Sequence, residues 1–130
     1  MMNTEWKYVE SFDKELITNI EEYFNIKLPE DYKKLLETCN RGKPERAQFD
    51  IVSRKECVLD YLIDLNVLIE TSKRINKPKI IPIGTDPFGN IIGFNIGDTG
   101  RIESLIFWDH ETKSETTITK TFSEFLEMLY

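Results

Sequence analysis

The stretch at residues 80–94, IIPIGTDPFGNIIGF, constrains the fold more than any other part of the chain. Two runs of mostly β-branched residues flank a short polar segment. Both runs are too apolar for a ribbon with one wet face, so we predict two strands inside a covered sheet. The segment between them holds proline, glycine and asparagine, the residue types that set turn backbone angles. The sequence therefore predicts a strand, a tight loop of specified geometry and a second strand.

Periodicity and end signals outline the rest of the chain. We expect amphipathic helices at 11–24, 29–39, about 66–74 and 121–129, the second ended by left-handed residues at Asn40 and Gly42, the third capped by Asn66 and the last by a Thr121–Glu124 capping box. The segment at 48–53 alternates weakly and predicts an edge strand. Residues 58–63 fit a strand or the start of a helix by periodicity alone. A turn at 97–100 makes 91–96 and 103–109 antiparallel neighbours, and 115–120 adds a further strand.

This order predicts an α+β fold for residues 1–130 as a single domain. We expect a central, mostly antiparallel sheet of about five or six strands, with helices from both chain ends packed on it. A chain of this length buries enough surface to fold without metal or disulfide.

Three separated motifs carry a family resemblance. The segment IPIGTDPFGN, followed by an aliphatic strand and the strand end FWDHE at 107–111, resembles the SUKH superfamily, the domain shared by fungal cell-wall-assembly regulators and many bacterial immunity proteins. LPEDY at 28–32 with NRG at 40–42 is similar to the family's early helix and its stop, and TFSEFL at 121–126 to its closing helix. The resemblance covers nearly the whole chain in the right order. It implies the SUKH fold and favours a strand at 58–63.

Charge and cysteine usage narrow the classes of partner and compartment. The chain has 17 lysines and arginines against 23 aspartates and glutamates, a formal net charge of −6. This balance argues against direct binding of nucleic acid or anionic membranes and suits a basic partner, although many soluble domains are acidic for solubility alone. No window is apolar enough to span a bilayer, and the charged residues 1–15 predict no signal peptide. Cys39 and Cys57 lie in apolar contexts typical of buried free thiols, which favours the cytoplasm.

The strongest candidates for chemistry are three carboxylates, Asp86, Asp109 and Glu111, and the single histidine, His110. At the ends of adjacent strands they would suit a small metal-dependent hydrolase using Asp86, Asp109 and His110. The donor inventory is thin, because one histidine leaves such a site dependent on carboxylates. The alternative is that Asp86 accepts backbone N–H bonds in a turn and that His110 is an exposed strand-end residue. We predict no enzyme, no cofactor and no metal.

The resemblance implies a protein-binding function. Most bacterial proteins that look like this chain are immunity proteins, which bind the effector domain of a polymorphic toxin, often a nuclease, and block it by stoichiometric occlusion in the cytoplasm. An acidic inhibitor gains electrostatically steered association with a basic effector domain. The alternative that the resemblance implies is a regulatory or scaffolding module of the cell-wall-regulator type. The oligomeric state stays open.

We place the candidate partner-binding surface at one end of the sheet, together with acidic helix faces. Its candidate residues are Asp86, Phe88, Asn90, Trp108, Asp109 and Glu111. Trp108 either completes the core, as a strand tryptophan usually does, or forms one wall of a surface groove. Phe88 either covers its loop or makes an exposed contact.

Overall fold

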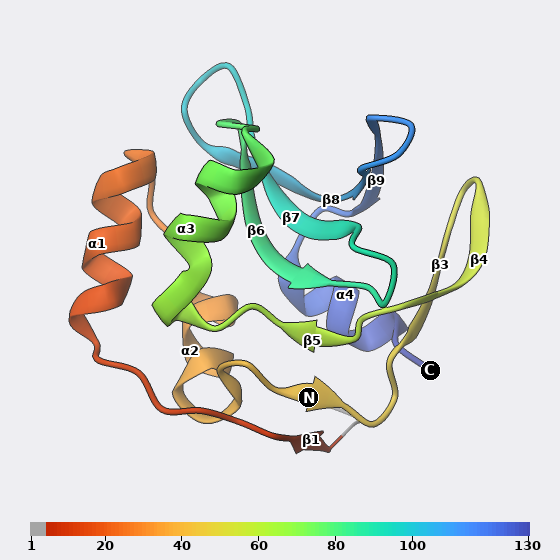
Figure 1. Cartoon of the computed structure of the whole chain (residues 1–130), viewed down its shortest axis with the longest axis horizontal. Coiled ribbons are helices and arrows are strands. Elements are labelled where there is room, and N and C mark those ends of the chain that lie inside the picture. The colour runs from red at the N-terminus through yellow and green to blue at the C-terminus, as the bar shows by residue number, and fades with distance from the viewer. Residues whose placement is uncertain (1–4) are drawn as a thin grey trace.

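A five-stranded antiparallel sheet forms the centre of the structure, a computed structural model that describes residues 5–130 (Figure 1). Residues 1–4, part of the stretch that predicts no signal peptide, lie outside the described residues. In spatial order the strands are β5 (Tyr61–Leu62), β6 (Ile80–Thr85), β7 (Ile91–Ile96), β8 (Ile102–Asp109) and β9 (Ser114–Thr119). Each strand runs antiparallel to its neighbours.

Two small sheets and four helices complete the described part of the chain. The small sheets pair β1 (Trp6–Lys7) with β2 (Lys43–Pro44), and β3 (Gln48–Ile51) with β4 (Arg54–Val58). The helices are α1 (Glu15–Phe24), α2 (Glu30–Cys39), α3 (Leu65–Ile75) and α4 (Phe122–Met128). These elements confirm the predicted α+β class and the antiparallel sheet with helices from both chain ends. None of the helices within residues 5–130 combines the length and apolar character needed to cross a bilayer.

The predicted central strand pair is β6 and β7. Thr85 pairs with Ile91 at the loop end, and every residue of the two strands is buried except Thr85 and Asn95, as the continuous apolar runs predict. At Gly93 a Cβ would lie 2.7 Å from the backbone oxygen of Ile81. A larger residue at that position would force the two backbones apart.

An aromatic cluster joins the terminal helices to the sheet. The ring of Tyr32 on α2 meets Phe94 of β7 and Phe122 of α4 edge-on, each at 5.3 Å between centroids. Phe125 of α4 meets Phe49 of β3 in the same way at 5.2 Å. Elsewhere α3 packs against β6, and α1 lies beside α3 at the left of Figure 1. Burial of these large rings supplies much of the hydrophobic stabilisation of the fold.

The end of α2 differs from the prediction. Asn40 has φ −53°, and the left-handed residue is Arg41, with φ 65°. The prediction was wrong because the Asn40 side chain is buried and has another role. Its Nδ2 donates to Glu10 O and Asp64 Oδ1, and its Oδ1 accepts from Leu65 N at 3.0 Å. Asn40 thus ties three segments together instead of ending the helix in a left-handed turn.

The N-terminal cap of α4 was predicted correctly, whereas that of α3 was not. The capping box of α4 is confirmed, since Thr121 Oγ1 accepts from Glu124 N and Glu124 Oε1 accepts from Thr121 N, both at 3.1 Å. The N-cap of α3 is Asp64, not Asn66 as predicted. Asp64 Oδ1 accepts from the backbone N of Asn66 at 3.0 Å, because a carboxylate at the position before the first helical residue reaches the free N–H groups of the first turn.

The segment before α3 is also more divided than predicted. Residues 58–63 form no continuous strand: Val58 ends β4, and only Tyr61 and Leu62 pair with β6. The edge strand expected at 48–53 is β3, and it forms a hairpin with β4, which the sequence pattern did not predict.

The segment that contains β2 and β3 pairs with residues from near the start of the sequence and with its last residue, Tyr130. β2 pairs with β1, while Gln48 at the start of β3 exchanges two backbone hydrogen bonds with Tyr130, at 3.0 and 2.9 Å. The Tyr130 hydroxyl also donates to Asp50 Oδ1 at 2.6 Å.

Candidate functional site

Asp86 organises the loop between β6 and β7, residues 86–90. Its Oδ1 accepts from the backbone N–H groups of Phe88 and Asn90 at 2.9 and 2.8 Å, and its Oδ2 accepts from Asn90 Nδ2 at 2.8 Å. Gly89 has φ +88°, a conformation that glycine adopts without strain. The loop is therefore closed by a buried carboxylate, as the turn interpretation of Asp86 predicted.

Asn90 links this loop to the turn between β8 and β9, residues 110–113. Because Asn90 Nδ2 donates to the Asp86 carboxylate, its Oδ1 faces His110. That oxygen accepts from His110 N at 3.1 Å and lies 2.8 Å from His110 Nδ1. An amide oxygen only accepts, so Nδ1 carries the proton in this arrangement. His110 is half-buried against Gly89 and is not the exposed strand-end residue that the sequence suggested.

Asp109 fixes the same turn from the other side. Its Oδ1 accepts from the backbone N–H groups of Glu111 and Thr112 at 2.9 and 3.2 Å, and its Oδ2 accepts from Arg54 Nη2 at 2.9 Å. The N–H groups of Thr112 and Glu111, together with the Arg54 guanidinium, hold the pKa of Asp109 below its ordinary value. The guanidinium also lies 5.3 Å from the ring centroid of Phe107. Asp109 thus joins the end of β8 to the hairpin β3–β4.

The structure brings the six candidate residues to one end of the sheet, but it divides them into two classes. Asp86, Asn90, Trp108 and Asp109 are buried, and the three polar ones among them use their side chains to hold loop backbone. Phe88 is 74% exposed, and Glu111 is also exposed. The exposed side chains of Phe88 and Glu111 are open to solvent, whereas those of Asp86, Asn90 and Asp109 hold the two loops in place.

Two residues of this region were missed by the sequence interpretation. Arg54 supplies the ion pair to Asp109, and Val52, at the tip of hairpin β3–β4, is 96% exposed. No periodic signal in the sequence distinguishes Val52 from the preceding Ile51, which is half-buried. Nothing local in the sequence pairs Arg54 with a residue 55 positions away.

Metal-ligand geometry is not found in this region. Among residues 5–130 no three histidine, cysteine, aspartate or glutamate side chains gather as a potential metal-binding group. Asp86 and His110, two members of the hydrolase set, are separated by the Asn90 amide that bonds to both. Cys39 and Cys57 are buried free thiols, as predicted, and burial raises the pKa of Cys57.

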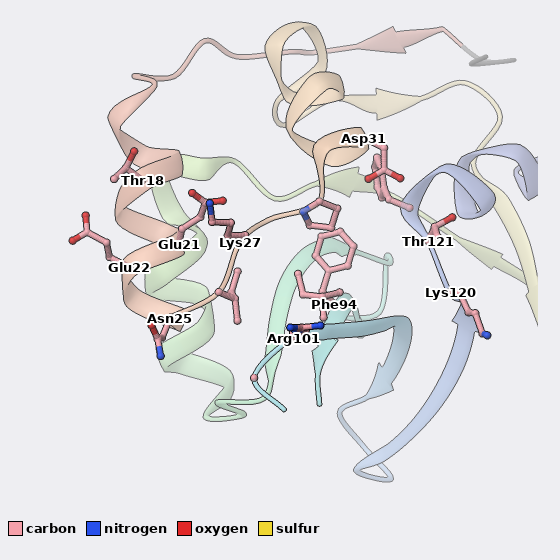
Figure 2. Close-up of a pocket in the computed structure, with 15 residues that line it drawn as sticks. Thr18, Glu21, Glu22, Asn25, Lys27, Asp31, Phe94, Arg101, Lys120 and Thr121 are labelled. Carbon is pink, nitrogen blue, oxygen red and sulfur yellow. The ribbon is translucent and has the colours of Figure 1, made fainter. Parts of the chain in front are cut away.

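A separate cavity of about 850 Å³ lies between the end of α1, the segment leading into α2, and the turn between β7 and β8 (Figure 2). Figure 2 shows Phe94 near its middle, with Glu22 and Lys120 at opposite margins. Its charged lining residues are Glu21, Glu22, Lys27, Asp31, Arg101 and Lys120. Acids and bases balance, so the lining selects no ligand charge.

One family matches this chain over most of its length. The SUKH_6 family model, described as SMI1-KNR4 cell-wall, matches residues 14–126. A comparison with curated proteins finds no match. The matched range runs from the residue before α1 into α4 and includes the whole central sheet and both loops held by Asp86 and Asp109.

Proposed function

The chain belongs to the SMI1-KNR4 family of SUKH domains, and from this premise we propose that it is an immunity protein that neutralises a cognate polymorphic-toxin effector domain. It acts in the cytoplasm of the producing cell by stoichiometric occlusion and has no catalytic step of its own. The partner is a basic protein domain, often a nuclease in such systems.

The observation that carries this proposal is the exposed Phe88 ring on a loop that buried hydrogen bonds hold rigid. Large aromatic side chains on preorganised loops are typical anchors of protein interfaces, because they bury much apolar area while losing little conformational entropy. The Asp86 carboxylate fixes the Phe88 backbone directly, since it accepts the Phe88 N–H.

Charge gives the proposal its second support. The formal net charge of −6 attracts a basic effector domain and accelerates encounter, and exposed Glu111 adds an anion beside the Phe88 loop. Such steering weakens at high ionic strength, because salt screens exposed charges over about 8 Å at physiological concentration. The proposed complex therefore associates faster at low salt.

The first test is co-expression with the effector domain encoded beside this chain, followed by growth measurement and size-exclusion chromatography. Growth rescue with a stoichiometric, salt-sensitive complex supports the immunity function. Failure of both with every neighbouring candidate contradicts it.

The second test is substitution within the measured complex. Phe88→Ala is expected to raise Kd about 30-fold, the effect of losing a hot spot of about 2 kcal/mol. Tyr23→Ala on α1 is the matched control, because Tyr23 is also an exposed aromatic residue but lies far along the chain from the loop. Equal Kd values for the two variants would show that the Phe88 side chain is not part of the interface.

The family description favours one alternative. The description of the family, SMI1-KNR4 cell-wall, agrees with a regulatory or scaffolding module that docks on another protein. Such a module would use the same exposed surface around Phe88 to bind a partner that is not a toxin. If the chain forms a stable complex with another protein in cells that do not make the neighbouring toxin, the regulatory or scaffolding function is favoured.

A further inference from the structure

A groove of about 990 Å³ lies beside α3, on the face of the sheet opposite the aromatic cluster. Ile91 and Trp108 form a register pair on this face and alternate with Ile92 and Phe107, of which Phe107 packs on Phe49. We call it the Trp108 groove and define it by lining residues from five segments: Tyr61, Val67, Arg74, Ile91, Trp108 and Lys113.

The lining contains a buried hydrogen-bond donor that is not used. Trp108 is 4% exposed, and its indole Nε1 is buried with no acceptor in the described part of the protein. A buried N–H group without a partner costs free energy, so nearly all such groups in folded proteins are paired with protein, water or ligand. An acceptor brought by a bound molecule would relieve this cost.

Two cations of the groove, Lys113 and Arg74, are free to take an anion, whereas Arg41 donates to the backbone oxygen of Tyr8. Lys113 Nζ lies 5.9 Å from the Trp108 ring centroid, and the Arg41 guanidinium lies 5.6 Å from that of Tyr61. Neither Lys113 nor Arg74 forms an ion pair within residues 5–130.

Most of the carboxylates along the groove are already committed as acceptors. Asp60 accepts from Lys43, Asp64 from the first turn of α3, and Asp86 from its own loop. Glu70, exposed on α3, is the one lining carboxylate without such a bond among the described residues. The unused hydrogen-bonding capacity of the groove is therefore mainly that of donors.

We propose that the Trp108 groove binds an extended acidic segment of the protein partner, with a carboxylate accepting from the Trp108 indole and neighbouring carboxylates meeting Lys113 and Arg74. The cations come from separate elements, α3 and the β8–β9 turn, so spaced acidic side chains match them better than a single terminal carboxylate. This inference rests on the proposed function for the origin of the segment. The groove lining holds three cations and four carboxylates, so the segment is recognised through these unused donors and not through a net positive charge.

The direct test uses peptides and needs no toxin. The probe is a blocked peptide that alternates aspartate and serine, and the control peptide replaces each aspartate by asparagine. In a Trp6→Phe background Trp108 is the sole tryptophan, so its fluorescence reports occupancy of the groove. We expect the acidic peptide to bind at least about tenfold more tightly, because charged acceptors form the stronger hydrogen bonds. Equal binding of both peptides, or none, overturns the proposal.

Variants measured by calorimetry locate the site. Trp108→Phe keeps an aromatic ring at this position, removes the N–H and is expected to weaken peptide binding about tenfold. Arg74→Gln is expected to weaken it about fivefold, and Lys73→Gln, its neighbour on α3 that faces Tyr23 instead, leaves it unchanged. Unchanged binding by Arg74→Gln, which is exposed and leaves the core intact, overturns the proposal even if Trp108→Phe folds poorly.

Two further measurements separate this inference from the proposed function. A serine–glycine peptide with a free terminal carboxylate serves as a third probe, and tighter binding of that peptide than of the acidic one overturns the acidic-segment assignment. If the wild-type chain rescues growth but Arg74→Gln and Trp108→Phe bind the effector domain as tightly, the groove inference fails and the immunity function stands. If growth rescue fails, the peptide titration still shows whether the Trp108 groove binds an acidic segment.

Discussion

A hydrogen bond of 2.9 Å joins Arg54, at the start of β4, to Asp109, at the end of β8. It connects the hairpin β3–β4, whose tip at Val52 is exposed, to the turn that carries Glu111, so two segments distant in sequence lie side by side. Asp109 also accepts hydrogen bonds from two backbone N–H groups of that turn. The same carboxylate therefore stabilises the turn and forms the ion pair with Arg54.

Asp109 gives the fold a defined acid sensitivity. Its pKa is held low by the N–H groups of Thr112 and Glu111 and by Arg54, so the folded protein binds a proton here less readily than the unfolded chain. This carboxylate therefore stabilises the fold above its ordinary pKa of about 4, and that contribution disappears as the pH falls through the folded-state value. We expect Asp109→Asn to flatten the loss of unfolding free energy between about pH 6 and pH 2, measured in urea. Asp98→Asn, at an exposed turn, should leave the pH profile unchanged.

Removing the loop carboxylate should be costly. Asp86→Ala leaves the backbone N–H and the amide of Asn90 without their acceptor, and both are buried, so we expect a loss of about 3 kcal/mol in unfolding free energy. Asp98→Ala is the matched control and should change stability by less than about 0.5 kcal/mol. Similar denaturant midpoints for the two variants would show that the Asp86 bonds contribute little.

The single histidine makes its tautomer directly measurable. Because Asn90 Oδ1 accepts from its ring, neutral His110 should carry its proton on Nδ1. Nitrogen-15 chemical shifts of the neutral imidazole would show this form. In Asn90→Ala the preference for Nδ1 should weaken. A neutral ring protonated on Nε2 in the wild-type protein would contradict the hydrogen-bond assignment.

The aromatic cluster and the exposed aromatic residue should behave in opposite ways. Phe122→Ala removes a fully buried ring that contacts Tyr32 and Phe94, and we expect it to cost about 3–5 kcal/mol. Phe88→Ala should cost less than about 0.5 kcal/mol because the ring is exposed. Chemical denaturation measures both. A large loss of stability in Phe88→Ala would mean that the ring covers its loop, and its effect on partner binding would then be indirect.

The sequence predicts the centre of the fold because the signals there are local. Continuous β-branched runs and turn residues specify β6, the loop at 86–90 and β7, and the capping box specifies the start of α4. The hairpin partner β4 was missed because its first residues, Arg54, Lys55 and Glu56, are charged and exposed, a pattern that carries no strand periodicity.

The location of the candidate site was predicted from the sequence, but the burial and contacts of its side chains were not. Sequence reasoning located the loops, since strand ends and turn residues mark them, but it could not tell a buried carboxylate from an exposed one. That distinction depends on contacts such as Asn90–His110 and Arg54–Asp109, which form between separate segments. The Trp108 groove has the same origin, because each of its walls comes from a different element.

The pairing of Gln48 with Tyr130 has a kinetic consequence. These residues lie far apart in the sequence, and the loop they close carries one of the largest entropic costs in the molecule. Contacts of such long separation slow folding relative to local helices and hairpins. During synthesis, the β2–β3 segment emerges before Tyr130, so the backbone groups of Gln48 stay unpaired until Tyr130 has been made. A chain with this topology therefore completes its fold only after the segment that carries Tyr130 has been made.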